Sequence, residues 1–177
     1  MIVCKFGGTS VADAAAIART ADIVRGRTER RPVVVVSALA GATNALLAAA
    51  EQAATGHLVA AIAVVEALRD RHMHVIAELL GDDAGAGEIA ADTSVMFDEL
   101  AHLVEALSVL GHVTERSLDA ISSAGERLSA PLVTAALVRA GVDAVLVDSR
   151  DVMITEASFG RAEPLTEAIA TACRDRL

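Results

Sequence analysis

The chain has 177 residues, of which 15 are Lys or Arg and 24 are Asp or Glu, so its formal net charge at pH 7 is −9. This excess of negative charge argues against nucleic-acid binding, because phosphate contacts require clustered positive charge. Hydrophobic residues make up 54% and charged residues 22%, which argues against a disordered chain and predicts a single domain with a sizeable core.

The first residues lack the long apolar stretch of a signal peptide. The most hydrophobic region, residues 42–68, is interrupted by two glutamates and a histidine, so it lacks the run of about 18–20 apolar residues that crosses a membrane. The two cysteines, Cys4 and Cys173, have neither metal-type nor disulfide-type spacing. We therefore expect a cytoplasmic protein that does not insert into a membrane.

Residues 2–6 and 32–37 are rich in β-branched residues and predict two strands. A helical pattern lies between them, from Asp13 as N-cap to about Arg30, and Pro32 ends it. The four valines at 33–36 show no alternation, which is typical of a strand buried on both faces of a parallel sheet. Strand, helix and strand of this length predict a right-handed βαβ unit and the α/β class.

Residues 57–112 predict a helical hairpin inserted into the α/β unit. Each predicted helix carries one apolar stripe, formed by Leu58, Ile62, Val65, Leu68, Val75 and Leu79 in the first and by Leu100, Leu103, Val104, Leu107 and Leu110 in the second. The segment 81–87, made of Gly, Asp and Ala, predicts the turn between them.

Residues 113–177 predict a helix from about Glu115 to Arg139 with Gly141 as its C-cap, a third strand at 143–147, and a terminal helix over 163–177 opened by Pro164. We interpret residues 1–177 as one domain, with a strand–loop–helix core (1–56), the hairpin (57–112) and this last part (113–177). Three strands leave unpaired sheet edges, so we expect further chain or another subunit, and a homo-oligomer.

Two loops of small residues follow the first two strands. Gly7 and Gly8 follow the first strand; glycines can adopt positive φ and turn backbone N–H groups toward an anion, which predicts a phosphate site unless the segment is merely a tight turn. Ser37 and Thr43 lie in the second loop, residues 37–44, at the end of a strand where ligands of parallel sheets bind. The alternative is that Thr43 or Asn44 only caps the following helix.

Residues 5–11 (KFGGTSV) and 36–44 (VSALAGATN) resemble the beginning of an aspartate kinase. Residues 122–129 (SSAGERLS) and 159–164 (FGRAEP) extend the resemblance in the expected order, so that it spans essentially the whole chain. The resemblance implies the amino-acid kinase fold, a parallel-sheet α/β sandwich. It also implies transfer of the γ-phosphoryl group of ATP to the side-chain carboxylate of L-aspartate, the first step toward lysine, threonine and methionine, with Mg²⁺ carried by the nucleotide.

The family pattern implies a phosphate-binding end of the site. Lys5 would be the catalytic residue on the transferring phosphoryl group, where its charge offsets the charge of the oxygens. Phe6, Gly7 and Gly8 would form the phosphate loop with their backbone, and Ser37 would lie near the phosphate or the acceptor carboxylate.

The same pattern implies that Thr43 binds aspartate and that Glu126 holds its ammonium group. Gly125, inside a predicted helix, indicates a close approach to the backbone beside Glu126. We expect no metal ligands among the side chains; His72 and His74, for example, are two residues apart on a helix and point in different directions.

Aspartate kinases continue with a Gly-Arg-Gly-Gly-Ser-Asp segment whose Arg binds substrate and whose Asp is catalytic, and this chain ends before it. The resemblance therefore implies the N-terminal part of a longer enzyme. Two alternatives stay open. One is another amino-acid kinase, acting on glutamate, carbamate or a nucleoside monophosphate, and the other is a non-catalytic module that associates through its helical hairpin.

Overall fold

The first two strands pair as the sequence predicts. In the computed structural model, which describes residues 1–83 and 85–176, β1 (Ile2–Phe6) and β2 (Pro32–Val36) form a parallel two-stranded sheet with α1 (Ala14–Arg25) between them. The other helices are α2 (Ala42–Ala54), α3 (Leu58–Leu80), α4 (Ala86–Leu110), α5 (Glu115–Arg139) and α6 (Thr166–Arg176). Short 3-10 helices cover Gly8–Val11, Thr28–Arg30 and Ser149–Asp151. The predicted α/β class is confirmed.

Helix α1 begins where the sequence predicts and ends earlier. The Asp13 carboxylate accepts the backbone N–H of Ala16 at 2.7 Å, so Asp13 is the N-cap. The prediction that this helix continues to about Arg30 is wrong, because Gly26 is its C-cap and a separate 3-10 turn follows. Arg31 then adopts φ 48° as the chain turns into β2.

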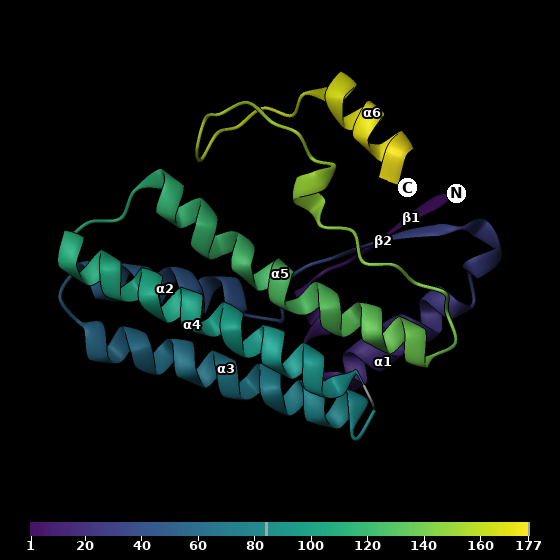
Figure 1. Ribbon diagram of the computed structural model, residues 1–177, viewed down its shortest axis with the longest axis horizontal. Coiled ribbons are helices and arrows are strands. Elements are labelled where there is room, and N and C mark those ends of the chain that lie inside the picture. Colours follow the sequence, from purple (N-terminus) through teal and green to yellow (C-terminus); the bar gives the residue numbers. More distant parts are fainter. Residues whose placement is uncertain (84, 177) are drawn as a thin grey trace.

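Helices α2, α3, α4 and α5 pack into a bundle beside the sheet (Figure 1). The predicted hairpin is confirmed as α3 and α4, although Ala84 in its turn lies outside the described residues. Both apolar stripes are largely buried, with Leu110, at 61% exposure, as an exception. Because α2 also packs against α3, α4 and α5, the hairpin is part of a four-helix bundle.

Helix α5 has the predicted bounds and is capped at both ends. Thr114 and Ser117 form a capping box in which each side chain accepts the other's backbone N–H, at 3.1 and 2.9 Å. At the other end Gly141 adopts φ 81°, and the N–H of Val142 donates to the carbonyl of Leu137 at 2.9 Å. This is the Schellman arrangement that glycine favours.

The third strand predicted at 143–147 does not form, and Val145 and Leu146 are 83% and 48% exposed. A strand requires a second backbone to pair with, and within the described part of the chain this segment has none. The last helix begins at Thr166 instead of residue 163, because Pro164 is held in an isolated antiparallel bridge with Thr155. Its predicted last residue, Leu177, lies outside the described residues.

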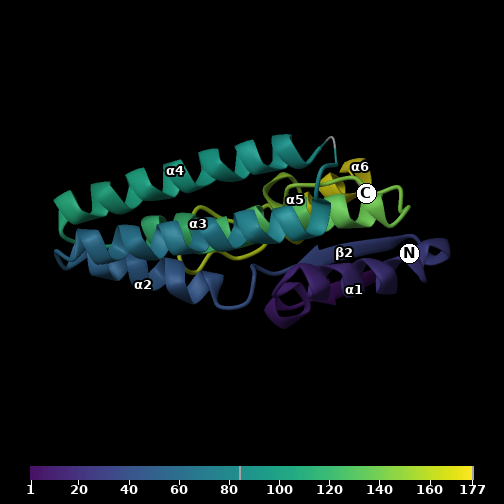
Figure 2. The same ribbon diagram turned by 90° about the horizontal axis from the view of Figure 1, so that it is seen from below.

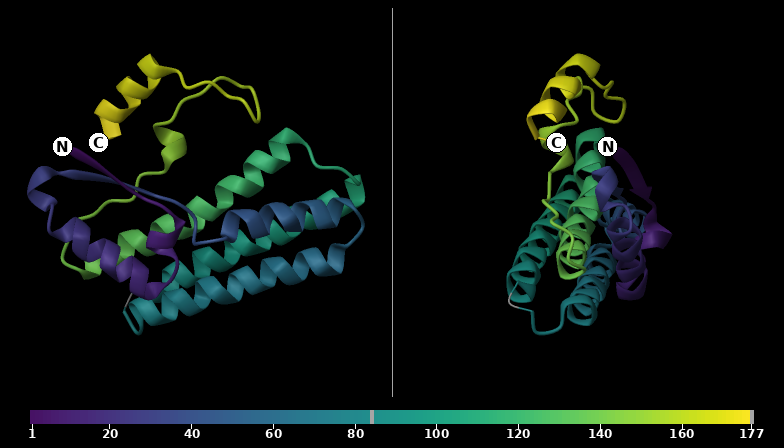
Figure 3. Two further views of the ribbon diagram at one scale, coloured as in Figure 1. Left: turned by 180° about the vertical axis from the view of Figure 1, so that it is seen from behind. Right: turned by 90° about the vertical axis from the view of Figure 1, so that its right-hand side faces the viewer.

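One face of the sheet is exposed. Phe6, Val34 and Val36 pack against the core, whereas Val3 and Val35, on the other face, are 70% and 44% exposed. Figure 2 shows α1 running along β2, and Figure 3 shows that the N-terminus lies near α6. The expectation that residues 33–36 are buried on both faces is therefore wrong for the described chain, in which no element covers this face.

No helix in the described residues combines the length and the hydropathy needed to cross a membrane.

Candidate functional site

The loops that follow β1 and β2 meet at the carboxyl edge of the sheet. They surround a hollow of about 200 Å³, lined by Gly8 from the first loop and by residues 37–41, Thr43 and Asn44 from the second. The N–H of Ser37 donates to the carbonyl of Phe6 at 3.1 Å, which holds the beginning of the second loop against β1. Ligands of open parallel sheets bind at this edge.

Neither glycine of the first loop has a positive φ, and Gly8 matters because of the space that a side chain would occupy. Gly7 has φ −80°, and the positive-φ glycines of the described chain do not include Gly8. A Cβ on Gly8 would lie 3.2 Å from the carbonyl oxygen of Ala38, so the lack of a side chain lets the two loops approach. The expectation of positive φ at this loop is wrong, whereas Gly41 of the second loop has φ 78°.

Gly41 is the N-cap of α2, and among the described residues no side chain caps this helix. Thr43 and Asn44 lie inside its first turn, so the alternative that one of them is the cap is wrong. The first turn of an uncapped helix has backbone N–H groups available to an anion. Because Thr43 and Asn44 line the hollow, this end of α2 borders the candidate site.

Helix α5 closes the site from the other side. The N–H of Ala38 donates to Oε1 of Glu126 at 3.4 Å, and the hydroxyl of Ser129 donates to the carbonyl of Ser37 at 2.7 Å. At Gly125 a Cβ would lie 2.7 Å from the Cβ of Ala38 and 3.4 Å from Oγ1 of Thr43. The close approach expected at Gly125 is therefore confirmed, and residues about 90 positions apart in the chain are brought together.

Two other expected site residues, Lys5 and Phe6, do not direct their side chains into the hollow. Lys5 is exposed on β1 and is not among the residues that line the hollow. The side chain of Phe6 packs against the core, so only its backbone faces the second loop. The structure thus brings together Gly8, Ser37 and Thr43 around the hollow, and Lys5 lies on the strand that leads into it.

Sequence reasoning missed Arg71. This residue of α3 donates from Nη1 to the carbonyl of Ala40 at 2.7 Å and from Nη2 to the carbonyl of Ala12 at 2.8 Å. No sequence signal marks it, since its partners lie 31 and 59 residues away and are backbone atoms. Only the packing of α3 against α1 and α2 brings them together.

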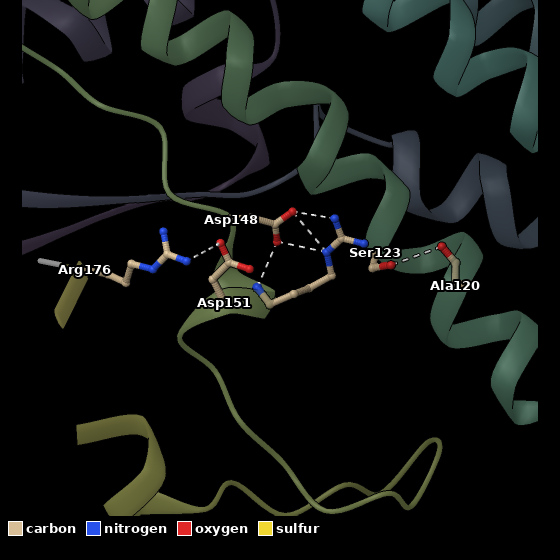
Figure 4. Close-up of polar contacts among 6 residues, drawn as sticks. Ala120, Ser123, Asp148, Asp151 and Arg176 are labelled. Atoms are coloured by element: carbon tan, nitrogen blue, oxygen red, sulfur yellow. Dashed lines mark hydrogen bonds and ion pairs between the residues drawn. The ribbon is translucent and has the colours of Figure 1, made fainter. Parts of the chain in front are cut away.

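Sequence reasoning also missed an ionic cluster after α5 (Figure 4). Nε of Arg150 donates to both carboxylate oxygens of Asp148, at 2.9 and 3.0 Å, and this contact is the main cause that lowers the pKa of Asp148 to about 2. Arg127 of α5 lowers it further, and Arg176 lies 3.8 Å from Asp151. The side chains of Arg150 and Asp148 are 62% and 35% exposed, so solvent screens the pair and it contributes little to stability. The Asp-x-Arg spacing after a predicted strand is the signal that could have found it.

Comparison with known proteins identifies the family. The amino acid kinase family matches residues 1–177, the entire chain. The chain belongs to the amino acid kinase family.

This family member is 36% identical, over 175 residues, to lysine-sensitive aspartokinase 3 of Escherichia coli (strain K12), an alignment covering 96% of this chain and 36% of that protein. It is 32% identical to aspartokinase 1, chloroplastic, of Arabidopsis thaliana, over 99% of this chain and 30% of the relative. Its structure is similar to that of E. coli aspartokinase III in complex with aspartate and ADP (R-state), with a TM-score of 0.86, 34% identity, and coverage of 99% of this chain and 37% of that one. The chain therefore spans about a third of the length of these relatives.

Proposed function

We propose that this chain is the aspartate-binding part of an aspartate kinase, which transfers the γ-phosphoryl group of ATP to the side-chain carboxylate of L-aspartate and forms 4-phospho-L-aspartate. One observation carries the proposal. Segments that resemble aspartate kinases at 5–11, 36–44 and 122–129 converge on one hollow at the carboxyl edge of the sheet. The likeness to aspartokinases over nearly all of this chain supports it.

The acceptor amino acid would bind between α2 and α5. Glu126 is half-buried and its Oε1 accepts only a long hydrogen bond, so this carboxylate can accept stronger bonds from an ammonium group. Thr43 offers a hydroxyl, and the uncapped first turn of α2 offers N–H groups to a carboxylate. These groups match the positive and negative ends of an amino acid.

The phosphoryl group would enter from the first loop. The backbone of Phe6, Gly7 and Gly8 with the hydroxyl of Ser37 would surround its oxygens, and the Lys5 ammonium would offset their charge. An oxygen of the acceptor carboxylate forms a bond to the γ-phosphorus while the bond from that phosphorus to the bridging oxygen of ADP breaks. Such a reaction depends mainly on positioning and charge, so it needs no general base among these residues.

Magnesium would be carried by the nucleotide phosphates. The described side chains contain no group of three or more His, Cys, Asp or Glu residues placed to hold a metal ion. We therefore assign no residue of this chain to the metal.

We also propose the three-part division of the chain and its cytoplasmic setting. The divisions at residues 56 and 112 fall in the turns between α2 and α3 and between α4 and α5. The cytoplasmic setting rests on Cys4 and Cys173, which are free thiols in the described chain and fit a reducing compartment.

Isothermal titration calorimetry with L-aspartate tests the proposal. We expect binding by the wild-type chain and an affinity at least about tenfold lower, which is about 1.4 kcal/mol, in Thr43→Val and in Glu126→Gln. Glu99→Gln, an exposed change on α4, is the matched control and should bind like the wild type.

A folded wild-type chain that binds no L-aspartate would contradict the proposal. Binding of L-glutamate in place of L-aspartate would favour another member of the amino acid kinase family.

A further inference from the structure

Arg71 connects the two loops of the candidate site. It lies in α3, is half-buried, and donates from one terminal nitrogen to the carbonyl of Ala40 at 2.7 Å and from the other to the carbonyl of Ala12 at 2.8 Å. Ala12 ends the loop that follows β1, and Ala40 lies in the loop that follows β2. One side chain therefore spans both loops.

The two carbonyls lie at points that determine the shape of the site. Ala40 precedes Gly41, whose positive φ begins α2 and so places Thr43. The Cα of Ala40 also lies 3.4 Å from the position of a Cβ on Gly8. Ala12 follows the 3-10 helix that Gly8 begins and precedes Asp13, the N-cap of α1. A shift of either carbonyl would change the separation of Gly8 and Thr43.

The chemistry of arginine suits this role. Its guanidinium is planar and carries five N–H donors in a fixed geometry, and its charge strengthens the bonds that it donates to carbonyls. Arg71 takes part in none of the ion pairs formed within residues 1–83 and 85–176. Arg71 extends from helix α3, which packs against α1, α2, α4 and α5 and is therefore held in place on several sides.

We infer that Arg71 is a positioning residue that holds the loop after β1 and the loop after β2 at the separation that binding of L-aspartate requires. The inference rests on the proposed function, because it concerns the same site.

The test compares Arg71→Met, Arg71→Lys and Arg69→Met with the wild-type chain. Arg69 is a matched control, because it extends from the same helix but donates to Ser94 and Asp98 of α4 instead of to the loops. L-aspartate affinity is measured by calorimetry, and the opening of each segment by amide hydrogen exchange. The methionine variant keeps an unbranched side chain of good helix propensity but removes the charge and the donors. The lysine variant keeps the charge but has one nitrogen in place of the planar guanidinium with its two terminal nitrogens.

We expect Arg71→Met to lower the affinity for L-aspartate at least about tenfold and to speed exchange selectively in residues 7–13 and 38–42. Arg71→Lys should bind L-aspartate more tightly than Arg71→Met but less tightly than the wild type, because its single nitrogen cannot bridge both carbonyls as the guanidinium does. Arg69→Met should bind L-aspartate like the wild type.

If the wild type binds L-aspartate and both Arg71 variants bind it equally well, the inference alone is overturned. It is also overturned if exchange in Arg71→Met rises as much in α2–α5 as in the loops, since that result means general destabilisation. A folded wild type that binds no L-aspartate overturns the proposed function, and this inference with it.

Discussion

At the scale of single residues, the site depends on where side chains are missing. Gly125 lets α5 approach the second loop, and Gly8 lets the first loop approach it from the other side. Neither glycine needs an unusual backbone angle, so the reason for each is the space that a Cβ would occupy. The contacts of Ser37, Thr43 and Glu126 depend on these two approaches.

Gly125→Ala is expected to weaken both the site and the fold. The added Cβ would lie 2.7 Å from the Cβ of Ala38, which is too close for two carbon atoms. Overpacking of this kind costs about 1–3 kcal/mol, against a gain in helix propensity of about 0.8–1 kcal/mol. Urea unfolding should show a net loss of stability of up to about 2 kcal/mol, and calorimetry a lower affinity for L-aspartate.

Gly87→Ala provides the matched control for this prediction. Gly87 also lies in a helix, but a Cβ there would meet no atom within 4 Å. This variant should keep its affinity and gain up to about 1 kcal/mol of stability. Equal stabilisation of both variants would show that α5 has room to move away from the loop.

The sequence predicted Ser37, Thr43 and Glu126 because they lie in recognisable segments that follow predicted strands or occupy a predicted helix. It could not predict Arg71, whose partners are carbonyls on two distant loops. Nor could it predict that Gly8 serves close packing, because a glycine that adopts positive φ and a glycine that avoids a clash are identical in sequence. Residue roles that depend on tertiary contacts need the structure.

At the scale of elements, the sequence predicted the β1–β2 pair and the bounds of α5, but it also predicted a third strand that has no partner in the described chain. The bounds of α5 and its glycine terminus follow from residues within one or two turns, Thr114 and Gly141 among them. The predicted strand at 143–147 has the right composition, but a strand also depends on a second backbone, which local sequence does not report. The hairpin was predicted because each apolar stripe marks its own helix.

Helix α3 contains a histidine, His72, that is buried in the core together with the apolar side chains of this helix. His72 is fully buried, its Nδ1–H donates to the carbonyl of Leu68 at 2.7 Å, and its ring lies edge-on to Phe97 with centroids 5.2 Å apart. Its Nε2 has no partner among the described residues. Burial is the main cause that lowers the pKa of His72 below 6.5, and the charge of Arg71 acts in the same direction.

This lowered pKa predicts a loss of stability in mild acid. Because the folded state binds the proton less readily than the unfolded state, the contribution is fully present above pH 6.5 and decreases as the pH falls below it. The free energy of unfolding should therefore decline by up to about 1.4 kcal/mol per pH unit more in the wild type than in His72→Leu. Urea unfolding between neutral and mildly acidic pH measures both slopes.

His74→Gln is the control, since His74 lies on the same helix but is exposed and pairs only with Glu78 at 3.3 Å. Its pH dependence should follow the wild type. Parallel slopes for the wild type and His72→Leu would mean that His72 is not the group that titrates.

At the scale of the whole molecule, the inner faces of the four-helix bundle are buried, whereas the sheet has one exposed face. The core runs from α1 through the four-helix bundle, while β1 and β2 expose one face and have no strand partner at their outer edges within residues 1–83 and 85–176. Exposed sheet edges and apolar patches promote association. The relatives are about three times as long as this chain.

We therefore expect this 177-residue chain to self-associate through its sheet, which is the form that the predicted homo-oligomer would take. Sedimentation velocity should show a concentration-dependent increase in mass that Val3→Thr combined with Val35→Thr reduces, because both valines are on the exposed face and threonine keeps their shape and strand propensity. Val59→Thr combined with Val109→Thr is the matched control, since both of these valines are 87% exposed but lie on α3 and α4. Association lost only in the control pair would place the interface on the helical hairpin, as a helical interaction module would require. A wild type that stays monomeric at every concentration would show that neither exposed surface holds two copies together.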